Sequence, residues 1–260
     1  ATVSAWRIPM AEFIHFRDID PARASSWTGK RVLSIDIDWA HDAVLEDTID
    51  LIERAAIKAC FFVTHDTPLL ARLRANPLFE LGLHPNFDPL LKGEALRSAR
   101  DIVLDLARVA PEAKVLRSHA MTTSGRWLEL YREAGVTHLS NYLMFGDANI
   151  HPFRQLNGLV EAPVHFADDG LLFQRAMSAV SFHLDTELLA SGGGLRVYNF
   201  HPIHLFLNAE SLDRYGASRP HAGDPIALRR LRFDGDGARG RLAFFGGHGQ
   251  AQLTHPGLAV

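Results

Sequence analysis

Short apolar runs alternate with amphipathic segments from about residue 31 to residue 200. The runs have the length of buried strands, and the segments between them repeat apolar residues at the spacing of one helical face. The stretch 44–57, for example, places Val44, Leu45, Leu51 and Ile52 on one side of a helix. Strands are predicted at residues 31–38, 59–63, 79–83, 113–118, 137–141, 159–164 and 195–200. Helices are predicted between them at residues 44–57, 68–75, 94–109 and 124–135.

Strands that alternate with helices in this way form a mostly parallel sheet. A barrel gathers the residues at its strand ends into one mouth, whereas a doubly wound open sheet concentrates its site at one switch point. The pattern favours an α/β, TIM-like barrel, because polar residues stand at successive strand ends. These residues are Asp36, Asp38, Thr64, His65, His84, Arg117, His119, Asn141, Glu161 and His201.

The whole chain, residues 1–260, is predicted to form a single domain of ordinary size for a barrel. Residues 1–30 show no clear period and are interpreted as an N-terminal decoration. Residues 206–260 are interpreted as a C-terminal extension. Within that extension, the glycine-rich stretch 234–247 predicts a turn followed by a terminal hairpin strand.

Composition and missing motifs argue against several functional classes. A net charge of -3 without long charged runs gives no reason to expect nucleic acid or an anionic membrane as partner. Cys60 is the single cysteine, so no disulfide framework exists. No apolar stretch is long enough to span a bilayer, and the absence of a recognisable signal peptide favours a cytoplasmic location. No GxGxxG turn, phosphate loop or GxSxG elbow is present, which argues against nucleotide binding and serine nucleophiles.

Asp36 and Asp38 end the first predicted strand. Residues two apart on a strand point to the same face, so both carboxylates leave one side of an apolar strand. Carboxylates in such a place require a cation, a proton or an arginine. The alternative is that Asp36 caps the next helix and Asp38 is solvated.

His84 follows the strand at 79–83 and precedes Pro85. If residues 85–88 form one helical turn, His84 and Asp88 lie four apart and can converge on one ion. With an aspartate of the first strand they would form a mixed nitrogen and oxygen set, which suits zinc and also accepts iron, manganese, cobalt or nickel. The alternative is that His84 is a capping or core histidine and Asp88 begins a loop.

Arginine and histidine stand at two further strand ends. Arg117 should hold a carboxylate such as Asp36 or Asp168, or a substrate anion, because an arginine in a barrel mouth is rarely left unpaired. His119 is a further metal ligand, a substrate contact or a hydrogen-bonded loop histidine. His201 is placed to protonate a leaving group. His204 is more often structural at such a position, and His65 either faces the mouth or belongs to a helix cap.

The order of these segments resembles the polysaccharide deacetylase family, also called the NodB-homology or carbohydrate esterase family 4 deacetylases. The similarity covers roughly residues 31–205 and is greatest in the helix and strand that end in IKACFFVTHD. Within the family the chain is similar to the divergent WbmS-like branch, which is linked to bacterial O-antigen biosynthesis. The other matching segments are IDIDWA, HPNFD, RSHA, EAPVHFADD and NFHPIHL.

This resemblance implies a distorted (β/α)7 barrel with one divalent metal ion, zinc by preference, that hydrolyses the N-acetyl group of an amino sugar. It implies that Asp38 and His84 bind the metal, that Asp36 is the base and that His201 is the general acid. Arg117 would orient the base, assisted by Asp168 or a neighbour. The carbohydrate would be the partner of the protein.

The chain departs from the family pattern at three positions. Ile37 separates two aspartates that are adjacent in the family, which leaves their roles open. Asp88 replaces the second metal histidine, and His119 is the alternative ligand. Trp39 replaces the usual glycine and would narrow the mouth or stack on a sugar ring. The candidate substrate-binding residues are Trp39, His65, His119, Glu161, Asp168 and His204.

Two alternative hypotheses about the function stay open. A glycosidase with two carboxylates would explain the acids but not His84, Asp88 and His201. A carbohydrate-binding barrel with a decayed catalytic site would explain the altered motifs.

Overall fold

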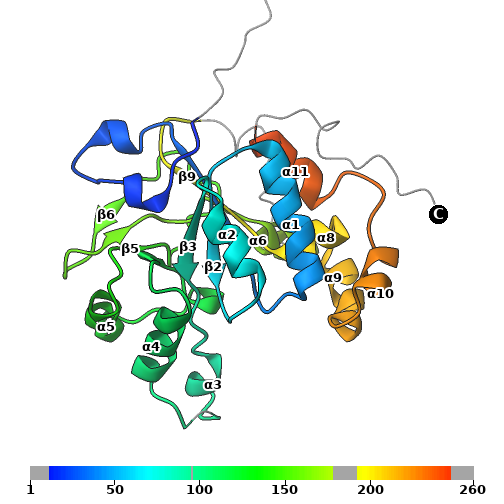
Figure 1. The fold of residues 1–260 in the computed structure, drawn as a ribbon. Helices are drawn as coiled ribbons and strands as arrows, with labels where there is room; N and C mark the ends of the chain where they lie inside the picture. The colour runs from blue at the N-terminus through cyan, green and yellow to red at the C-terminus, as the bar shows by residue number, and fades with distance from the viewer. Residues whose placement is uncertain (1–11, 95, 178–191, 247–260) are drawn as a thin grey trace, which may run out of the picture.

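One curled sheet, surrounded by helices, organises the computed structural model (Figure 1). The structure describes residues 12–94, 96–177 and 192–246. Within these ranges nine strands join in the order β6-β7-β5-β4-β3-β2-β1-β9-β8. All neighbours run parallel except β6 and β7. The strands are β1 Arg31–Asp36, β2 Ala59–Val63, β3 Phe79–Leu83, β4 Val115–Leu116, β5 His138–Leu139, β6 Phe153–Arg154, β7 Val160–Glu161, β8 Phe166–Ala167 and β9 Arg196–Phe200.

The sheet closes on itself through the single extended segment 160–167. This segment pairs with β5 at its start, where Leu139 is opposite Glu161, and with β9 at its end, where Phe166 is opposite Tyr198. A bridge between Leu143 and Val164 lies between these two pairings. Counting β7 and β8 as one position, and leaving out β6, which pairs only with β7 and is antiparallel to it, gives seven positions around the curl. The predicted distorted (β/α)7 barrel is therefore confirmed.

Helices cover the outside of the sheet. In Figure 1, α1 and α2 lie side by side over β1 to β3, while α4 and α5 lie beside the shorter strands. The helices are α1 Asp42–Ala55, α2 Leu69–Ala75, α3 Asp88–Leu91, α4 Ala99–Val109, α5 Leu128–Glu133, α6 Asp168–Ala176, α8 Pro202–Leu207, α9 Leu212–Ser218, α10 Pro225–Arg230 and α11 Ala238–Phe245. Short 3-10 helices lie at Phe16–Asp18, Ala24–Ser26, His119–Met121, Gly125–Trp127 and Arg219–His221. No helix in the described ranges combines the length and apolar character needed to cross a membrane.

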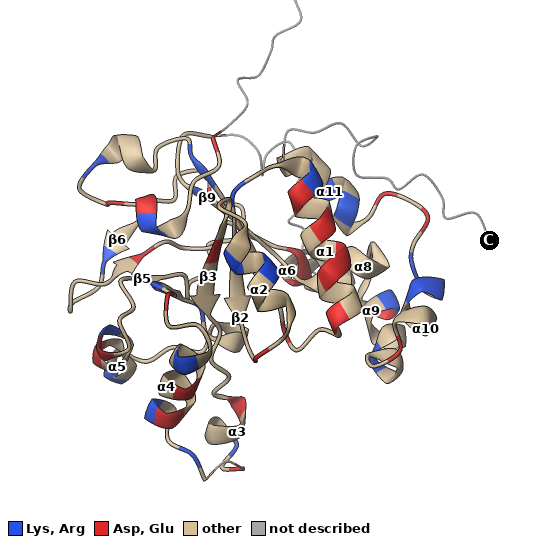
Figure 2. Cartoon of the chain, in the orientation of Figure 1, with Lys and Arg blue, Asp and Glu red and all other residues tan. Residues whose placement is uncertain are grey.

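Charged side chains lie on the outer faces of these helices. Acidic residues gather along α1 (Figure 2), where Arg72 of α2 forms ion pairs with Asp50 at 2.6 Å and Glu53 at 2.5 Å. The opposite face of α1 buries Leu45, Ile49 and other apolar residues against the sheet. Burial of this apolar face is the main force that fixes the helix on the sheet.

The C-terminal part of the chain differs from its prediction. The stretch expected to form a hairpin strand is the helix α11, whose Phe245 stacks on Tyr198 of β9 with ring centroids 4.3 Å apart. Leu242 is also buried, and Arg31 donates a hydrogen bond to the Phe245 carbonyl at 2.6 Å. Tertiary packing of this apolar face overrides the turn-forming glycines, so the prediction of a strand was wrong.

Residues 12–30 lie across the amino ends of the strands, opposite the predicted site. The Phe16 ring is fully buried against Phe62, and its N–H donates to a carboxylate oxygen of Glu80 at 2.9 Å. Nε2 of His15 lies 3.0 Å from the Leu78 carbonyl oxygen. Burial raises the pKa of Glu80 to about 7. The N-terminal segment therefore covers an acid at the base of the barrel.

Glu80 should make the stability of the protein depend on pH. Its native pKa of about 7 exceeds its ordinary value of 4.5, so its contribution is complete below pH 4.5 and is lost as the pH rises through about 7. Glu80→Gln removes the ionisation. We therefore expect the free energy of unfolding of the variant, relative to that of the wild type, to be about 2 kcal/mol higher at pH 8 than at pH 5. Urea unfolding at both pH values measures this, with the exposed Glu94→Gln as control. An equal effect at both pH values would contradict the assignment.

Candidate active site

The loops at the carboxyl ends of β1, β3, β4 and β9 meet around one cavity of about 470 Å³. Asp36 and Asp38 come from the end of β1, and His84 follows β3 directly. His119 lies in the loop after β4, and His201 follows β9. The site therefore forms where the alternating pattern places it, at the mouth of the barrel.

Three of the predicted residues present ligand atoms to a common point. The Oδ1 atom of Asp38 lies 3.1 Å from Nε2 of His84 and 3.3 Å from Nδ1 of His119. One ligand atom from each residue falls within 4.8 Å of the other two. This Oδ1 atom is buried and has no hydrogen-bond partner. A buried carboxylate oxygen without a donor, next to two imidazole nitrogens, has the chemistry of a divalent metal site.

The tautomer of His84 supports the same interpretation. Its Nδ1 atom lies 2.7 Å from the backbone carbonyl oxygen of Arg117. A carbonyl oxygen only accepts hydrogen bonds, so Nδ1 carries the hydrogen and donates it. The Nε2 atom then presents a lone pair toward Asp38. Metal-binding histidines are commonly held by this kind of second hydrogen bond.

Left-handed backbone conformations position two of these ligands. The φ angles are +41° at Asp38 and +54° at Trp39, and they are +52° at Ala120 and +51° at Met121, just after His119. Such angles cost roughly 1 to 2 kcal/mol for each residue other than glycine. Two adjacent strained pairs flank the group Asp38, His84 and His119, so the fold keeps these carboxylate and imidazole groups together against a local cost.

The charge state of Asp38 also suits a cation. Burial by itself would raise the pKa of Asp38, but the neighbouring His119 and His84, together with the charge of His201, hold this pKa well below its ordinary value. Asp38 in turn raises the pKa of His119. Asp38 is therefore a carboxylate at neutral pH, as metal binding requires.

Asp36 belongs to a separate hydrogen-bonded group inside the barrel. Its Oδ1 accepts from Nη1 of Arg117 at 2.9 Å, and its Oδ2 accepts from Nδ2 of Asn199 at 2.8 Å. Arg117 is fully buried and also donates to Ser34 and Ser140. The expectation that Arg117 holds a carboxylate is confirmed, with Asp36 rather than Asp168 as its partner. Asp36 is thus fixed, with Oδ2 3.9 Å from Nε2 of both His84 and His201.

A glycine makes room for this arginine. The Arg117 guanidinium lies over the Phe62 ring, 4.4 Å from its centroid. A Cβ atom at Gly82, on the neighbouring strand, would come within 2.6 Å of the same ring. Gly82 therefore lets Phe62 occupy the place where it supports the arginine.

Asp168 holds His201 on the other side of the cavity. Its Oδ1 accepts from Nδ1 of His201 at 2.6 Å, and its Oδ2 accepts from the His201 backbone N–H at 2.9 Å. Nε2 of His201 then faces the site, 3.6 Å from Oδ2 of Asp38. Burial would lower the pKa of His201, but the charge and hydrogen bond of Asp168 raise it well above its ordinary value. His201 is therefore an imidazolium that can donate a proton from Nε2.

Asp88 does not join this group. The predicted helical turn over residues 85–88 is wrong, because α3 begins only at Asp88 and residues 84–87 are not helical. Phe87 is fully buried against Trp127, and the His119 N–H donates to the Pro85 carbonyl oxygen at 3.0 Å. These contacts hold the loop open and bring His119, the alternative ligand, beside His84.

The remaining candidate substrate-binding residues divide into those that line a hollow and one, Glu161, that does not line the site. Trp39 is 47% exposed, and Trp39 and His65 line a second hollow next to the site. His204 lines the site, and its Nδ1 lies 3.1 Å from Oδ2 of Asp168. Glu161 does not line the cavity. It is fully buried, accepts the Asn141 N–H at 2.6 Å, and burial raises its pKa to about 7.

Sequence reasoning missed the polar residues that line the barrel interior below the site. Asn199 and Ser34 each hydrogen-bond to Arg117, and Asn199 also binds Asp36. Each precedes a site residue by two positions, Ser34 before Asp36 and Asn199 before His201. Period-two alternation of polar residues within apolar strands was the signal that could have identified them.

A family model described as WbmS-like polysaccharide deacetylase matches residues 33–219. The chain belongs to this family. A structure from Bordetella bronchiseptica, described as a polysaccharide deacetylase (WbmS) involved in O-antigen biosynthesis, is 38% identical with a TM-score of 0.83. The similarity covers 91% of this chain and 97% of that chain. Family membership confirms the resemblance noted from the sequence.

Two other solved structures are similar at lower scores. A polysaccharide deacetylase structure from Mycobacterium smegmatis is 18% identical, with a TM-score of 0.46 and coverage of 88% of this chain and 93% of that chain. A family 4 carbohydrate esterase from Streptomyces lividans is 12% identical, with a TM-score of 0.42 and coverage of 83% and 88%. No curated protein matches this member of the WbmS-like family.

Metal analysis of single variants tests the ligand set in this WbmS-like protein. We expect about one equivalent of a divalent ion in the wild type and almost none in Asp38→Ala, His84→Ala or His119→Ala, because three protein ligands are the usual minimum for a catalytic site. Asp88→Asn should keep the metal and is the matched control. Elemental analysis after dialysis without chelator measures this. Loss of metal in Asp88→Asn but not in His119→Ala would restore the ligand set predicted from spacing.

Proposed function

We propose that this protein is a metal-dependent deacetylase that hydrolyses the N-acetyl amide of an amino sugar during synthesis of a bacterial surface polysaccharide of the O-antigen type. Its membership of the WbmS-like family and the 38% identity to the Bordetella protein support this substrate class. The observation that carries the proposal is the position of the group Asp38, His84 and His119 next to the His201–Asp168 pair.

Asp38, His84 and His119 would hold one divalent ion. A donor set of one carboxylate and two imidazoles fits zinc best and also accepts iron, manganese, cobalt or nickel. When bound, the ion supplies Lewis-acid chemistry, polarising the acetyl carbonyl and lowering the pKa of water. Asp38 is already a carboxylate, and Nδ1 of His84 is already held by the Arg117 carbonyl oxygen, so these two groups need little rearrangement to bind the ion.

Asp36 is assigned as the general base. It lies outside the group of metal-binding atoms, yet its Oδ2 is 3.9 Å from Nε2 of His84 and so faces the same cavity. Arg117 and Asn199 fix the carboxylate, which directs its free lone pair toward the site. Asp36 would accept a proton from water as the oxygen of that water adds to the acetyl carbon.

His201 is assigned as the general acid. Asp168 holds its Nδ1 and keeps the ring protonated, so Nε2–H can be delivered to the amide nitrogen as the C–N bond breaks. The products are acetate and the free amine of the sugar. The two proton transfers therefore use two separate groups, each fixed by its own buried partner.

Replacing His201 separates metal binding from turnover. We expect His201→Ala to keep the metal and to lower kcat for acetate release by about 100- to 10,000-fold, the usual contribution of a general acid. The substrates are N-acetylated amino sugars offered free, nucleotide-linked and lipid-linked, and acetate is measured enzymatically. His151→Ala is the control and should behave as the wild type, because this exposed histidine packs against Trp27 of the N-terminal segment and does not line the site.

Full activity in His201→Ala would show that another group supplies the proton. Sugar binding without acetate release by the metal-loaded wild type would contradict the deacetylase and favour a carbohydrate-binding barrel. Acetate release that persists after complete removal of metal would contradict metal dependence.

A further inference from the structure

Asp168 lies between two histidines, of which the proposed mechanism uses only one. Asp168 begins α6, His201 directly precedes α8, and His204 lies within α8. Nδ1 of His201 donates to Oδ1 of Asp168 at 2.6 Å, and Nδ1 of His204 lies 3.1 Å from Oδ2 of the same carboxylate. One ligand atom from each of these three residues falls within 4.8 Å of the other two. We call Asp168, His201 and His204 the second group.

His204 is a buried polar residue whose place in the core is not explained by folding. It is only 3% exposed, yet neither of its ring nitrogens has a hydrogen-bond partner in the described part of the chain. A buried polar group without a partner is a cost to folding. The ring is nevertheless held in place, edge to face with Tyr215 at a centroid distance of 4.8 Å, and it lines the active-site cavity. An imidazole nitrogen is therefore kept available for a ligand that enters from the cavity.

The donor set of the second group is the same as that of Asp38, His84 and His119. Each consists of one carboxylate and two imidazoles, which suits zinc. Burial by itself would raise the pKa of Asp168, but the charges of the neighbouring His204 and His201 hold this pKa well below its ordinary value. Asp168 is therefore a carboxylate at neutral pH, as metal binding requires.

The spacing of the second group also suits a metal ion. Two ligand atoms of a tetrahedral zinc ion lie about 3.3 to 3.5 Å apart when the bonds are about 2.0 to 2.2 Å long. The 3.1 Å between His204 and Asp168 is already close to this value. The shorter distance between His201 and Asp168 belongs to a hydrogen bond, and it has to lengthen when an ion replaces the hydrogen.

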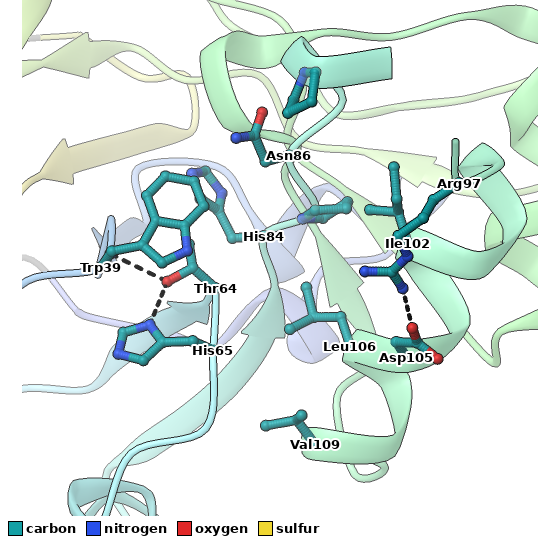
Figure 3. Close-up of a pocket in the computed structure, with 12 residues that line it drawn as sticks. Trp39, Thr64, His65, His84, Asn86, Arg97, Ile102, Asp105, Leu106 and Val109 are labelled. Carbon is teal, nitrogen blue, oxygen red and sulfur yellow. Dashed lines mark hydrogen bonds and ion pairs between the residues drawn. The ribbon is translucent and has the colours of Figure 1, made fainter. Parts of the chain in front are cut away.

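The two groups lie on different walls of the cavity. His84 stands with Trp39 where the cavity borders the hollow beside α4 (Figure 3). The second group does not line that hollow and comes from α6 and α8. His201 lies between the two groups, because its Nε2 is 3.6 Å from Oδ2 of Asp38 while its Nδ1 faces Asp168. The two groups would therefore hold two separate ions.

We propose that Asp168, His201 and His204 bind a second divalent ion, zinc by preference, and that this ion inhibits the enzyme. Binding at Nδ1 of His201 displaces the hydrogen now donated to Asp168, which leaves as a proton to water. The ring is then a neutral, metal-bound imidazole, a far weaker acid than an imidazolium, so Nε2 no longer delivers a proton to the amide nitrogen. The binding of the second ion follows from the geometry, whereas its inhibitory effect rests on the proposed deacetylase function.

Counting bound zinc tests the second site. Equilibrium dialysis of the wild type against rising free zinc should give about one equivalent at first and about two at excess. His204→Phe keeps an aromatic ring against Tyr215 and removes the ligand nitrogens, and His204→Gln is a second variant that keeps a polar side chain. We expect both to bind the second equivalent at least about 100-fold more weakly, the upper end of the effect of losing an outer hydrogen-bond partner. The same phenylalanine substitution at the exposed His221 is the matched control and should leave both equivalents bound.

Acetate release at each zinc concentration tests the inhibition. In the wild type and in His221→Phe, kcat should fall at least about 100-fold as the second equivalent binds, the lower limit for loss of a general acid. His204→Phe, compared with its own rate at one equivalent, should keep that rate over the same range of zinc. A wild type that binds only one equivalent at excess zinc, or a second equivalent that persists in both His204 variants, would overturn the second site. A second equivalent that leaves acetate release unchanged would overturn the inhibition.

The proposed function fails by a different result. If the protein with one equivalent releases no acetate from any N-acetylated sugar, the deacetylase proposal is wrong, and the zinc count still decides whether the second group binds an ion. His84→Ala should lose the first equivalent and keep the second, which distinguishes the two groups. Loss of both equivalents in His84→Ala would show that the second group does not bind an ion by itself.

Discussion

The buried contact between Arg117 and Asp36 is the interaction on which the site depends. A guanidinium with no exposed surface is tolerated because five hydrogen bonds to Ser34, Asp36, Ser140 and Asn199 engage all three of its nitrogen atoms. Removing one member of such a group leaves the other charge buried, at a cost of about 3 to 5 kcal/mol. The same bonds tie β1, β4, β5 and β9 together at the mouth, so the stability of the barrel and the orientation of the proposed base have one source.

The sequence could predict the scaffold because its signals are local. β2 and β3 occupy the predicted residues 59–63 and 79–83, since an apolar run in β2 and alternate bulky apolar residues in β3 leave little choice of conformation. The strands β4, β5 and β7 are only two residues long, but backbone bonds from Arg117 to Leu83 and from Ser140 to Leu116 continue the pairing beyond them. Local periodicity cannot show where a strand becomes a loop that still carries sheet-like hydrogen bonds.

The site could be predicted less completely, because two of its features depend on distant packing. Spacing favoured Asp88 as a partner of His84, whereas burial of Phe87 against Trp127 prevents the helical turn that this pairing needs. His119 reaches His84 only because its loop bonds to Pro85 and then turns through two left-handed residues. The helix α11 was missed for a related reason, since the aromatic stack of Phe245 on Tyr198 outweighs the local preference of glycine for turns.

Trp39, in the loop after β1, combines a strained backbone conformation with an exposed indole that lines two hollows. A glycine at position 39 would adopt the observed φ of +54° freely and would place no side chain between the two hollows that Trp39 lines. Trp39 instead keeps a conformation that costs roughly 1 to 2 kcal/mol, while half of its apolar ring stays in water. Neither burial nor backbone preference explains such a residue. A ligand that covers the indole would offset both costs at once, which is the physical reason for seeking the function of Trp39 in recognition rather than in folding.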